Sequence, residues 1–195
     1  LKIIDTDIHM SNNSIALQAC KAHIKDIIIY GASSSTWKSS HRLRIDDSNW
    51  SRVSLHIDSF EENNGVAGLI SIHNQIEECN WTLENTGFKL LDNEFRSTIF
   101  QSINPSGPSQ LTNNTIEGAY GFPDASIEIL GGDHVSFIDN LFLEGVVGLS
   151  FINAQATLSC NQFEGWDTAI KFKEKCDVFM NPQNGGGYNR LNGNR

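Results

Sequence analysis

The chain has 195 residues, of which 39% are hydrophobic and 19% charged, and its formal net charge is −9. This length suits one domain with a sizeable core. The acidic balance argues against a nucleic-acid partner, which needs a basic stripe to displace counterions from phosphates. No apolar run approaches the roughly 18 residues that a membrane span needs, so membrane insertion is not expected either.

The composition favours β-structure. The chain contains 20 Asn, 21 Ile and 16 Gly, a combination typical of short strands joined by many turns. It opens at Leu1 with neither an initiator Met nor a basic-then-apolar leader. We therefore expect residues 1–195 to form a single domain that is a fragment of a longer chain.

In the first half, two segments have the alternation of strands, at 23–31 and 52–60. Between these two segments, residues 32–40 are rich in Ser. Further along the chain, residues 101–110 hold two of the four prolines. Because insertions in repeat folds map to the turns between strands, we expect loops near 32–40 and 101–110.

From the middle of the chain onward, an asparagine motif repeats about every 21 residues. Three copies read Asn, a variable residue or residues, a large apolar residue and then Glu-Gly; they begin at Asn114, Asn140 and Asn161. Asn74 and Asn93 fit the first three positions of the motif, and Asn181 continues the series. A period of this size is typical of a solenoid.

Short alternating strands lie between these asparagines, at 126–130, 134–137 and 169–173. Period-two alternation gives each strand an inner and an outer face. Asn-Gly hairpin turns are almost absent, which disfavours a sandwich of hairpins. The sequence therefore predicts an all-β, right-handed parallel β-helix of about eight or nine coils, each of roughly 21 residues.

The repeated Asn has a physical role in such a fold. At a bend between strands the backbone often enters the left-handed region, which Asn tolerates better than other non-Gly residues, so we expect these residues there. Stacked side-chain amides can also form a hydrogen-bonded ladder along the axis. We expect this ladder at Asn74, Asn93, Asn114, Asn140, Asn161 and Asn181, with the Phe or Ile two places later stacked inside.

The period, the Asn-x-aromatic turns and the apolar-in strands resemble the right-handed β-helix superfamily. Its members include pectate lyases, polygalacturonases, phage tailspikes and the repeat regions of secreted bacterial surface proteins. The resemblance is strongest from Asn74 to Asn194. It implies the fold and an extracellular or cell-surface location, but this coil serves enzymes, adhesins and structural shafts alike.

The polygalacturonase chemistry is close to excluded, because the aspartate pairs lack that family's motif context and no Arg-x-Lys occurs. Uronic-acid lyases need a cation, or an Arg, to neutralise the substrate carboxylate and a Lys or Arg base. The weak catalytic candidates are Lys171, Lys173, Arg42 and Arg44, and the weak metal-ligand candidates are Asp5, Asp7 and His9. Alternation alone also puts polar residues on a solvated outer face, and we favour that reading for each group.

Other residues with chemical potential have weaker signals. His56 and His73 both fall at outward positions and could stack one turn apart, although two wet polar side chains are the commoner explanation. Exposed tryptophans stack on sugars, but buried packing is the favoured interpretation of Trp37, Trp50, Trp81 and Trp166. The four cysteines lack metal-ligand spacing and are expected to be buried free thiols.

Two functions remain open, and the oligomeric state is open as well. The favoured one is a non-catalytic structural or adhesive β-helix module of a secreted or cell-surface protein, with a polysaccharide or another surface component as its partner. The alternative is a polysaccharide lyase that cleaves uronic-acid polymers by β-elimination. The absence of a lyase motif and the small number of basic residues favour the first.

Calcium is the one cofactor that the charge pattern suggests. Carboxylates stacked along a face repel one another, and a divalent cation relieves this repulsion. We therefore predict that calcium raises the thermal unfolding temperature relative to a sample with chelator. Two superimposable unfolding curves would contradict this prediction.

Overall fold

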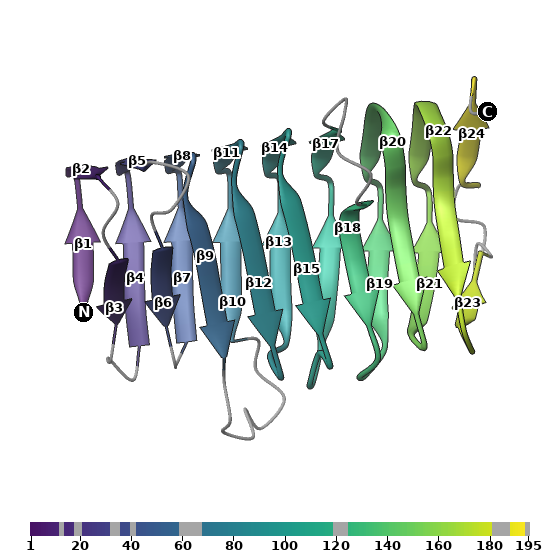
Figure 1. Ribbon diagram of the computed structural model, residues 1–195, viewed down its shortest axis with the longest axis horizontal. Helices are drawn as coiled ribbons and strands as arrows, with labels where there is room; N and C mark the ends of the chain where they lie inside the picture. Colours follow the sequence, from purple (N-terminus) through teal and green to yellow (C-terminus); the bar gives the residue numbers. More distant parts are fainter. Residues whose placement is uncertain are drawn as a thin grey trace.

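The computed structural model describes residues 1–11, 14–17, 21–31, 36–39, 42–58, 68–118, 125–180 and 188–193, and the regular elements in these ranges are all β-strands. The strands lie side by side along the long axis, with β1 at one end and β24 at the other (Figure 1). The all-β prediction is confirmed, and the arrangement is compatible with a parallel β-helix. Among the described residues, no helix is long and apolar enough to cross a membrane.

One sheet has nine parallel strands, and we call its outer surface the first face. Each strand pairs with the strand that precedes or follows it by one round of the chain, as in the register of Leu69 with Leu43 and Phe88. In spatial order the strands are β1 (Lys2–Ile4), β4 (Lys21–Lys25), β7 (Arg42–Asp46), β10 (Leu69–Ile72), β13 (Phe88–Leu91), β16 (Ser109–Thr112), β19 (Val135–Ile138), β21 (Gln155–Ser159) and β23 (Asp177–Phe179).

The remaining strands belong to a sheet with two arms, which we call the second and third faces. The second face contains β2 (Asp7–Met10), β5 (Ile28–Gly31), β8 (Asn49–Ser51), β11 (Gln75–Glu77), β14 (Glu94–Arg96) and β17 (Thr115–Glu117). The third face contains β3 (Ser14–Leu17), β6 (Thr36–Ser39), β9 (Ser54–Asp58), β12 (Asn80–Glu84), β15 (Ile99–Ile103) and β18 (Ala125–Leu130).

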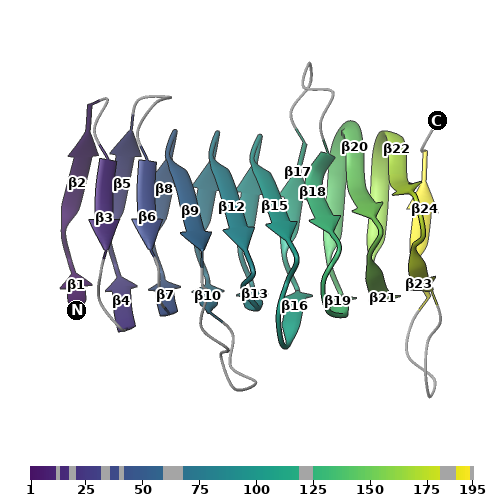
Figure 2. The same ribbon diagram turned by 60° about the horizontal axis from the view of Figure 1, so that its bottom comes forward.

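Two twelve-residue strands join these arms. The start of β20 (Leu141–Ile152) pairs with β17 and its end pairs with β18. The strand β22 (Gln162–Lys173) follows β20 along its whole length and also pairs with β24 (Arg190–Asn192). The tilted view shows the two faces meeting along these long strands (Figure 2).

The core is a stack of apolar side chains in the space between the three faces. Along the second face it contains Trp50, Ile76, Phe95, Ile116, Phe142 and Phe163, each at most 1% exposed. The rings of Phe142 and Phe163 are stacked, with centroids 4.4 Å apart. This confirms the predicted apolar ladder, because the large residue two places after a repeated Asn lies inside.

A row of buried amides runs beside this apolar stack. The Nδ2 of each asparagine donates to the Oδ1 of the next at 2.9–3.0 Å, from Asn74 through Asn93, Asn114, Asn140 and Asn161 to Asn189. Asn181 lies outside the described residues. At the other end, the hydroxyl of Ser48 stands in the same row, and its backbone N–H donates to Asn74 Oδ1 at 2.8 Å.

The left-handed corner lies one residue earlier than predicted. None of the ladder asparagines from Asn74 to Asn161 has a positive φ; the residue before each ladder position does. The amide must point inward to reach its neighbours, so the preceding residue turns the chain and points outward. The corner residues have φ of 50–59° and are Asp5, Asp26, Asp47, His73, Asp92, Asn113, Asp139 and Cys160.

Strand residues lie within both segments predicted as loops. Within 32–40, residues 36–39 form β6, which pairs with β3 and β9, while residues 32–35 and 40 lie outside the described residues. Thr and Trp favour strands, and a neighbour on each side outweighs the Ser-rich composition. Within 101–110, β15 and β16 leave only residues 104–108 between them. The prolines Pro105 and Pro108 lie in this connection, because proline lacks the N–H that a strand ladder uses.

The Glu-Gly part of the repeat has a packing role. Gly118 and Gly145 lie against the buried indole of Trp166, and a Cβ on Gly145 would come within 2.4 Å of that ring. The backbone of Gly145 also has a φ of +152°. These positions need glycine because the second face bends into the third directly over Trp166.

We predict that Asn114→Ala lowers the free energy of unfolding by about 2–4 kcal/mol, because it leaves buried polar groups without partners. In the native protein Asn114 Oδ1 accepts from the backbone N–H of Asn93, and Asn114 Nδ2 donates to the Leu90 carbonyl. The matched control is Asn80→Ala on the exposed surface of β12, with an expected change within about 0.5 kcal/mol. Equal denaturation midpoints for the two variants would contradict a structural role of the ladder.

Candidate functional site

The structure distributes the sequence-predicted catalytic residues over different faces. Lys171 and Lys173 are exposed on the third face, near the end of β22. Arg44 lies on β7 of the first face, as does Arg42, whose side chain lies outside what the structure describes. Because the lysines and arginines lie on different faces of the molecule, they do not form one catalytic centre.

The structure does not bring Asp5, Asp7 and His9 together on one strand surface. Asp5 is a left-handed corner residue before β2, whereas Asp7 and His9 lie on β2 itself. These three residues do not form a group with ligand atoms within 4.8 Å of one another. The His9 ring instead stacks on Tyr30, with centroids 5.5 Å apart. The expected alternation failed because the chain turns a corner at Asp5.

The described residues bring together a different set of ligands: His56, Asp58 and Glu84. One ligand atom from each of these side chains lies within 4.8 Å of the others, and all three are half-buried. His56 and Asp58 alternate along β9, so they share its outer surface. Glu84 is directly opposite Asp58 on the neighbouring strand β12.

The cluster lies at one end of a polar row on the third face. In register after His56 come Thr82, Gln101, Glu128, Ser150 and Lys171. Gln101 Nε2 donates to Glu128 Oε2 at 2.9 Å, and the Ser150 hydroxyl lies 3.4 Å from Glu128 Oε1. The carboxylate in the middle of the row is therefore satisfied by neutral donors.

His56 and His73 do not stack, because they lie at different places around the chain. His56 belongs to β9, whereas His73 is the corner residue between β10 and β11. The imidazole of His73 lies between two other corner residues, with its nitrogens 3.5 Å from carboxylate oxygens of Asp47 and Asp92. Lys25 similarly bridges Asp26 and Asp47, at 3.6 and 3.8 Å.

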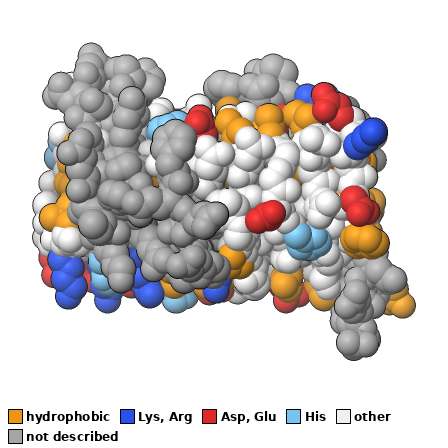
Figure 3. Space-filling model, turned by 90° about the horizontal axis from the view of Figure 1, so that it is seen from below, with side chains coloured by type: hydrophobic (Ala, Val, Ile, Leu, Met, Phe, Trp, Pro, Cys, Tyr) orange, Lys and Arg blue, Asp and Glu red, His pale blue; other side chains and the backbone are white. Residues whose placement is uncertain are grey.

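The first face has a buried carboxylate with basic neighbours. Asp46 Oδ2 lies 2.8 Å from His23 Nε2 and accepts from Arg44 Nε at 2.7 Å. The Asp46 side chain is 10% exposed, and its Oδ1 is buried without a hydrogen-bond partner. In Figure 3, Lys and Arg side chains gather along the lower edge of the view, at its left. Arg44 is thus held by an internal ion pair and is only partly available to a ligand.

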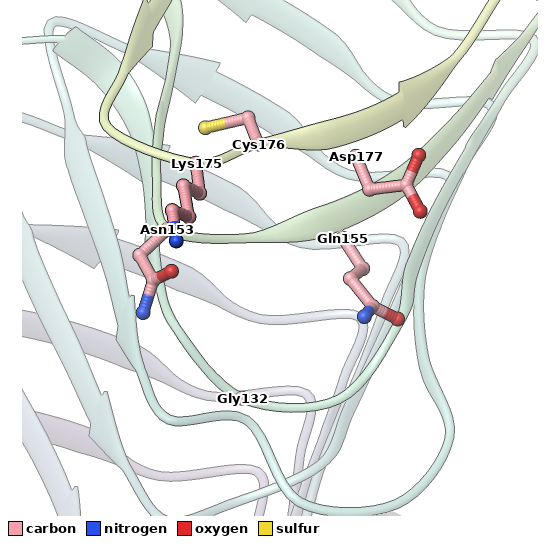
Figure 4. Close-up of a pocket in the computed structure, with 6 residues that line it drawn as sticks. All are labelled: Gly132, Asn153, Gln155, Lys175, Cys176 and Asp177. Carbon is pink, nitrogen blue, oxygen red and sulfur yellow. The ribbon is translucent and has the colours of Figure 1, made fainter.

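A shallow cavity of about 450 Å³ lies where the third face meets the first, near the C-terminal end. Figure 4 shows the Lys175 amine beside the Asn153 amide and the Asp177 carboxylate above the Gln155 amide. The Cys176 thiol points away from these groups and donates to the carbonyls of Phe151 and Lys173 at 3.3 and 3.1 Å. The cavity therefore offers polar contacts from two amides, one amine and one carboxylate.

The tryptophans considered as sugar platforms lie inside the protein. Trp50, Trp81 and Trp166 are at most 1% exposed, and the Trp37 side chain lies outside what the structure describes. The rings of Trp50 and Trp81 meet edge to face, with centroids 5.7 Å apart. The buried-packing interpretation is confirmed for these three residues.

Sequence reasoning missed the cluster of His56, Asp58 and Glu84 because its members come from different rounds of the chain. The segment Ser54-x-His56-x-Asp58 was visible as an outward pattern. Glu84 becomes a partner only once the register of β9 with β12 is known. Comparisons with protein-family models, with curated proteins and with solved structures found no match.

Among the described residues, Cys79 and Cys176 are free thiols. Burial raises the pKa of the Cys79 thiol to about 12.

Because the thiolate is the reactive form, we predict that iodoacetamide at mildly alkaline pH leaves Cys79 unmodified in the folded protein. Site-resolved mass spectrometry checks this, with the unfolded protein as the control. Equal native labelling of Cys79 and the half-exposed Cys176 would contradict the prediction.

Proposed function

We propose that the chain is a right-handed parallel β-helix of about nine coils that serves as a non-catalytic structural or adhesive module. The observation that carries this proposal is the row of buried amides from Asn74 to Asn189, each bonded to the next. Each of these amides is hydrogen-bonded to its neighbours in the row, so the strands of successive rounds are held in one register. Such a stack makes a rigid support for exposed side chains.

The distribution of reactive side chains supports a non-catalytic role. Lys171 lies four strands from Glu84 and five strands from His56 and Asp58, a separation of roughly 19–24 Å at the usual strand spacing. A base and the group that neutralises the substrate must contact the same sugar residue, so this separation is too large. Arg44 is on another face and is paired with Asp46.

The proposed partner is a polysaccharide or another component of a cell surface. Described basic side chains on the first face are in register along the axis, as those of Lys2, His23 and Arg44 are. Their spacing of about 4.8 Å per strand suits repeated acidic groups on an extended polymer. We accordingly propose a location outside the cell, as part of a secreted or surface protein.

The alternative, a polysaccharide lyase, has one observation in its favour. The buried Asp46 carboxylate holds the imidazole of His23, and Arg44 lies beside both. A buried carboxylate that orients a histidine is a common arrangement for a general base. In this alternative His23 takes the α-proton of a uronic acid, and Arg44 neutralises the substrate carboxylate.

The two functions are separated by an elimination assay. We predict no rise in the ultraviolet absorbance of unsaturated uronic-acid product with pectate, alginate or glycosaminoglycan substrates, with calcium present. A rise that His23→Ala abolishes, or one that Lys171→Ala or Lys173→Ala abolishes, would establish the lyase and contradict our proposal. If no rise occurs, retardation of the native protein in gels that contain the same polymers would identify the adhesive partner.

A further inference from the structure

The cluster of His56, Asp58 and Glu84 has a ligand set that a structural or adhesive role does not require. It supplies one imidazole nitrogen and two carboxylate oxygens, with the three atoms within 4.8 Å of one another. Zinc binds histidine nitrogen and carboxylate oxygen at about 2.0–2.2 Å, so small side-chain rotations bring all three atoms into contact with one ion. We propose that these three residues bind a divalent transition-metal ion of the zinc class.

The backbone holds the three side chains together. On β9, His56 and Asp58 are two residues apart on one surface; on β12, Thr82 lies opposite His56 and Glu84 lies opposite Asp58. These four residues form the corners of a rectangle of about 4.8 by 6.6 Å. Three corners carry metal ligands, and the parallel ladder fixes their positions without any loop.

Two carboxylates of the cluster oppose each other across neighbouring strands. Asp58 and Glu84 are half-buried and directly opposed, and like charges in this arrangement destabilise a sheet. Within the described part of the chain, neither carboxylate has a Lys or Arg nitrogen within 4.0 Å, and the one side-chain donor to Asp58 is the neutral Asn85 amide at 3.4 Å. By contrast, the opposed corner carboxylates Asp26 and Asp47 share Lys25.

The imidazole decides the class of metal. Calcium and magnesium prefer sites built of oxygen ligands, whereas imidazole suits zinc, copper, iron and nickel. Three protein ligands leave at least one coordination position for water or for a carboxylate of a partner. This inference does not depend on the proposed function, because a metal here would serve a shaft and an enzyme equally.

The test uses the full chain and the metals Zn²⁺ and Co²⁺. Calorimetric titration with Zn²⁺ is expected to show one site, and Co²⁺ is expected to give a visible absorption band that Zn²⁺ displaces. His56→Ala is expected to weaken this binding by at least about tenfold, since even loss of an outer-shell partner weakens metal sites by 10–100-fold. Glu84→Gln removes a second ligand with little change of shape and is expected to do the same.

His134→Ala is the matched control, because His134 lies near β19 on the first face with Thr157 as its hydrogen-bond partner. It is expected to bind Zn²⁺ as the native protein does. Circular dichroism reports whether each variant folds, and His56→Gln replaces His56→Ala if the latter does not. Absence of a Zn²⁺ site in the native protein, or binding that both His56 variants retain within twofold, would overturn the proposal. Calcium binding at this site that the His56 variants retain unchanged would overturn the proposal as well.

Discussion

The hydrogen bond between successive asparagine amides is the interaction on which the rest of the structure depends. The amides from Asn74 to Asn161 are buried, so each must find its donors and acceptors within the protein. From Asn93 to Asn161 the amide meets a backbone carbonyl of the preceding round and the Oδ1 of the following one. A shift of register by one residue would turn these groups outward and leave their partners unsatisfied. The ladder therefore fixes which outer residues are neighbours, including those of the candidate metal site.

Much of this arrangement could be read from the sequence, because one face of each strand is apolar and the asparagine repeat is regular from Asn74 to Asn161. The two ends of the row were harder. Ser48 was missed because a hydroxyl replaces the amide there. The spacing of about 21 residues predicts Asn181 as the next member, whereas the step from Asn161 to Asn189 is 28 residues.

The candidate metal site could not be predicted from the sequence because its members come from different rounds of the chain. Opposed residues are identified only by the offset between two rounds, and this offset varies along the chain. Ser48 and Asn74 are 26 residues apart, and so are Asp58 and Glu84. Had Ser48 been recognised as a ladder residue, the offset would have placed the two carboxylates together. Whether the catalytic candidates lie together could not be predicted either, since alternation within a strand does not tell on which face that strand lies.

The direction of the amide row has an electrical consequence. All five amide-to-amide bonds point the same way, with Nδ2 of one residue donating to Oδ1 of the next toward the C-terminus. Aligned carboxamide dipoles polarise one another, so a bond in the middle of the row is stronger than an isolated one. The row resembles in this respect the aligned peptide dipoles of a helix. Damage to a central amide would therefore weaken its neighbours on both sides, and the sensitivity to substitution should fall toward the two ends of the row.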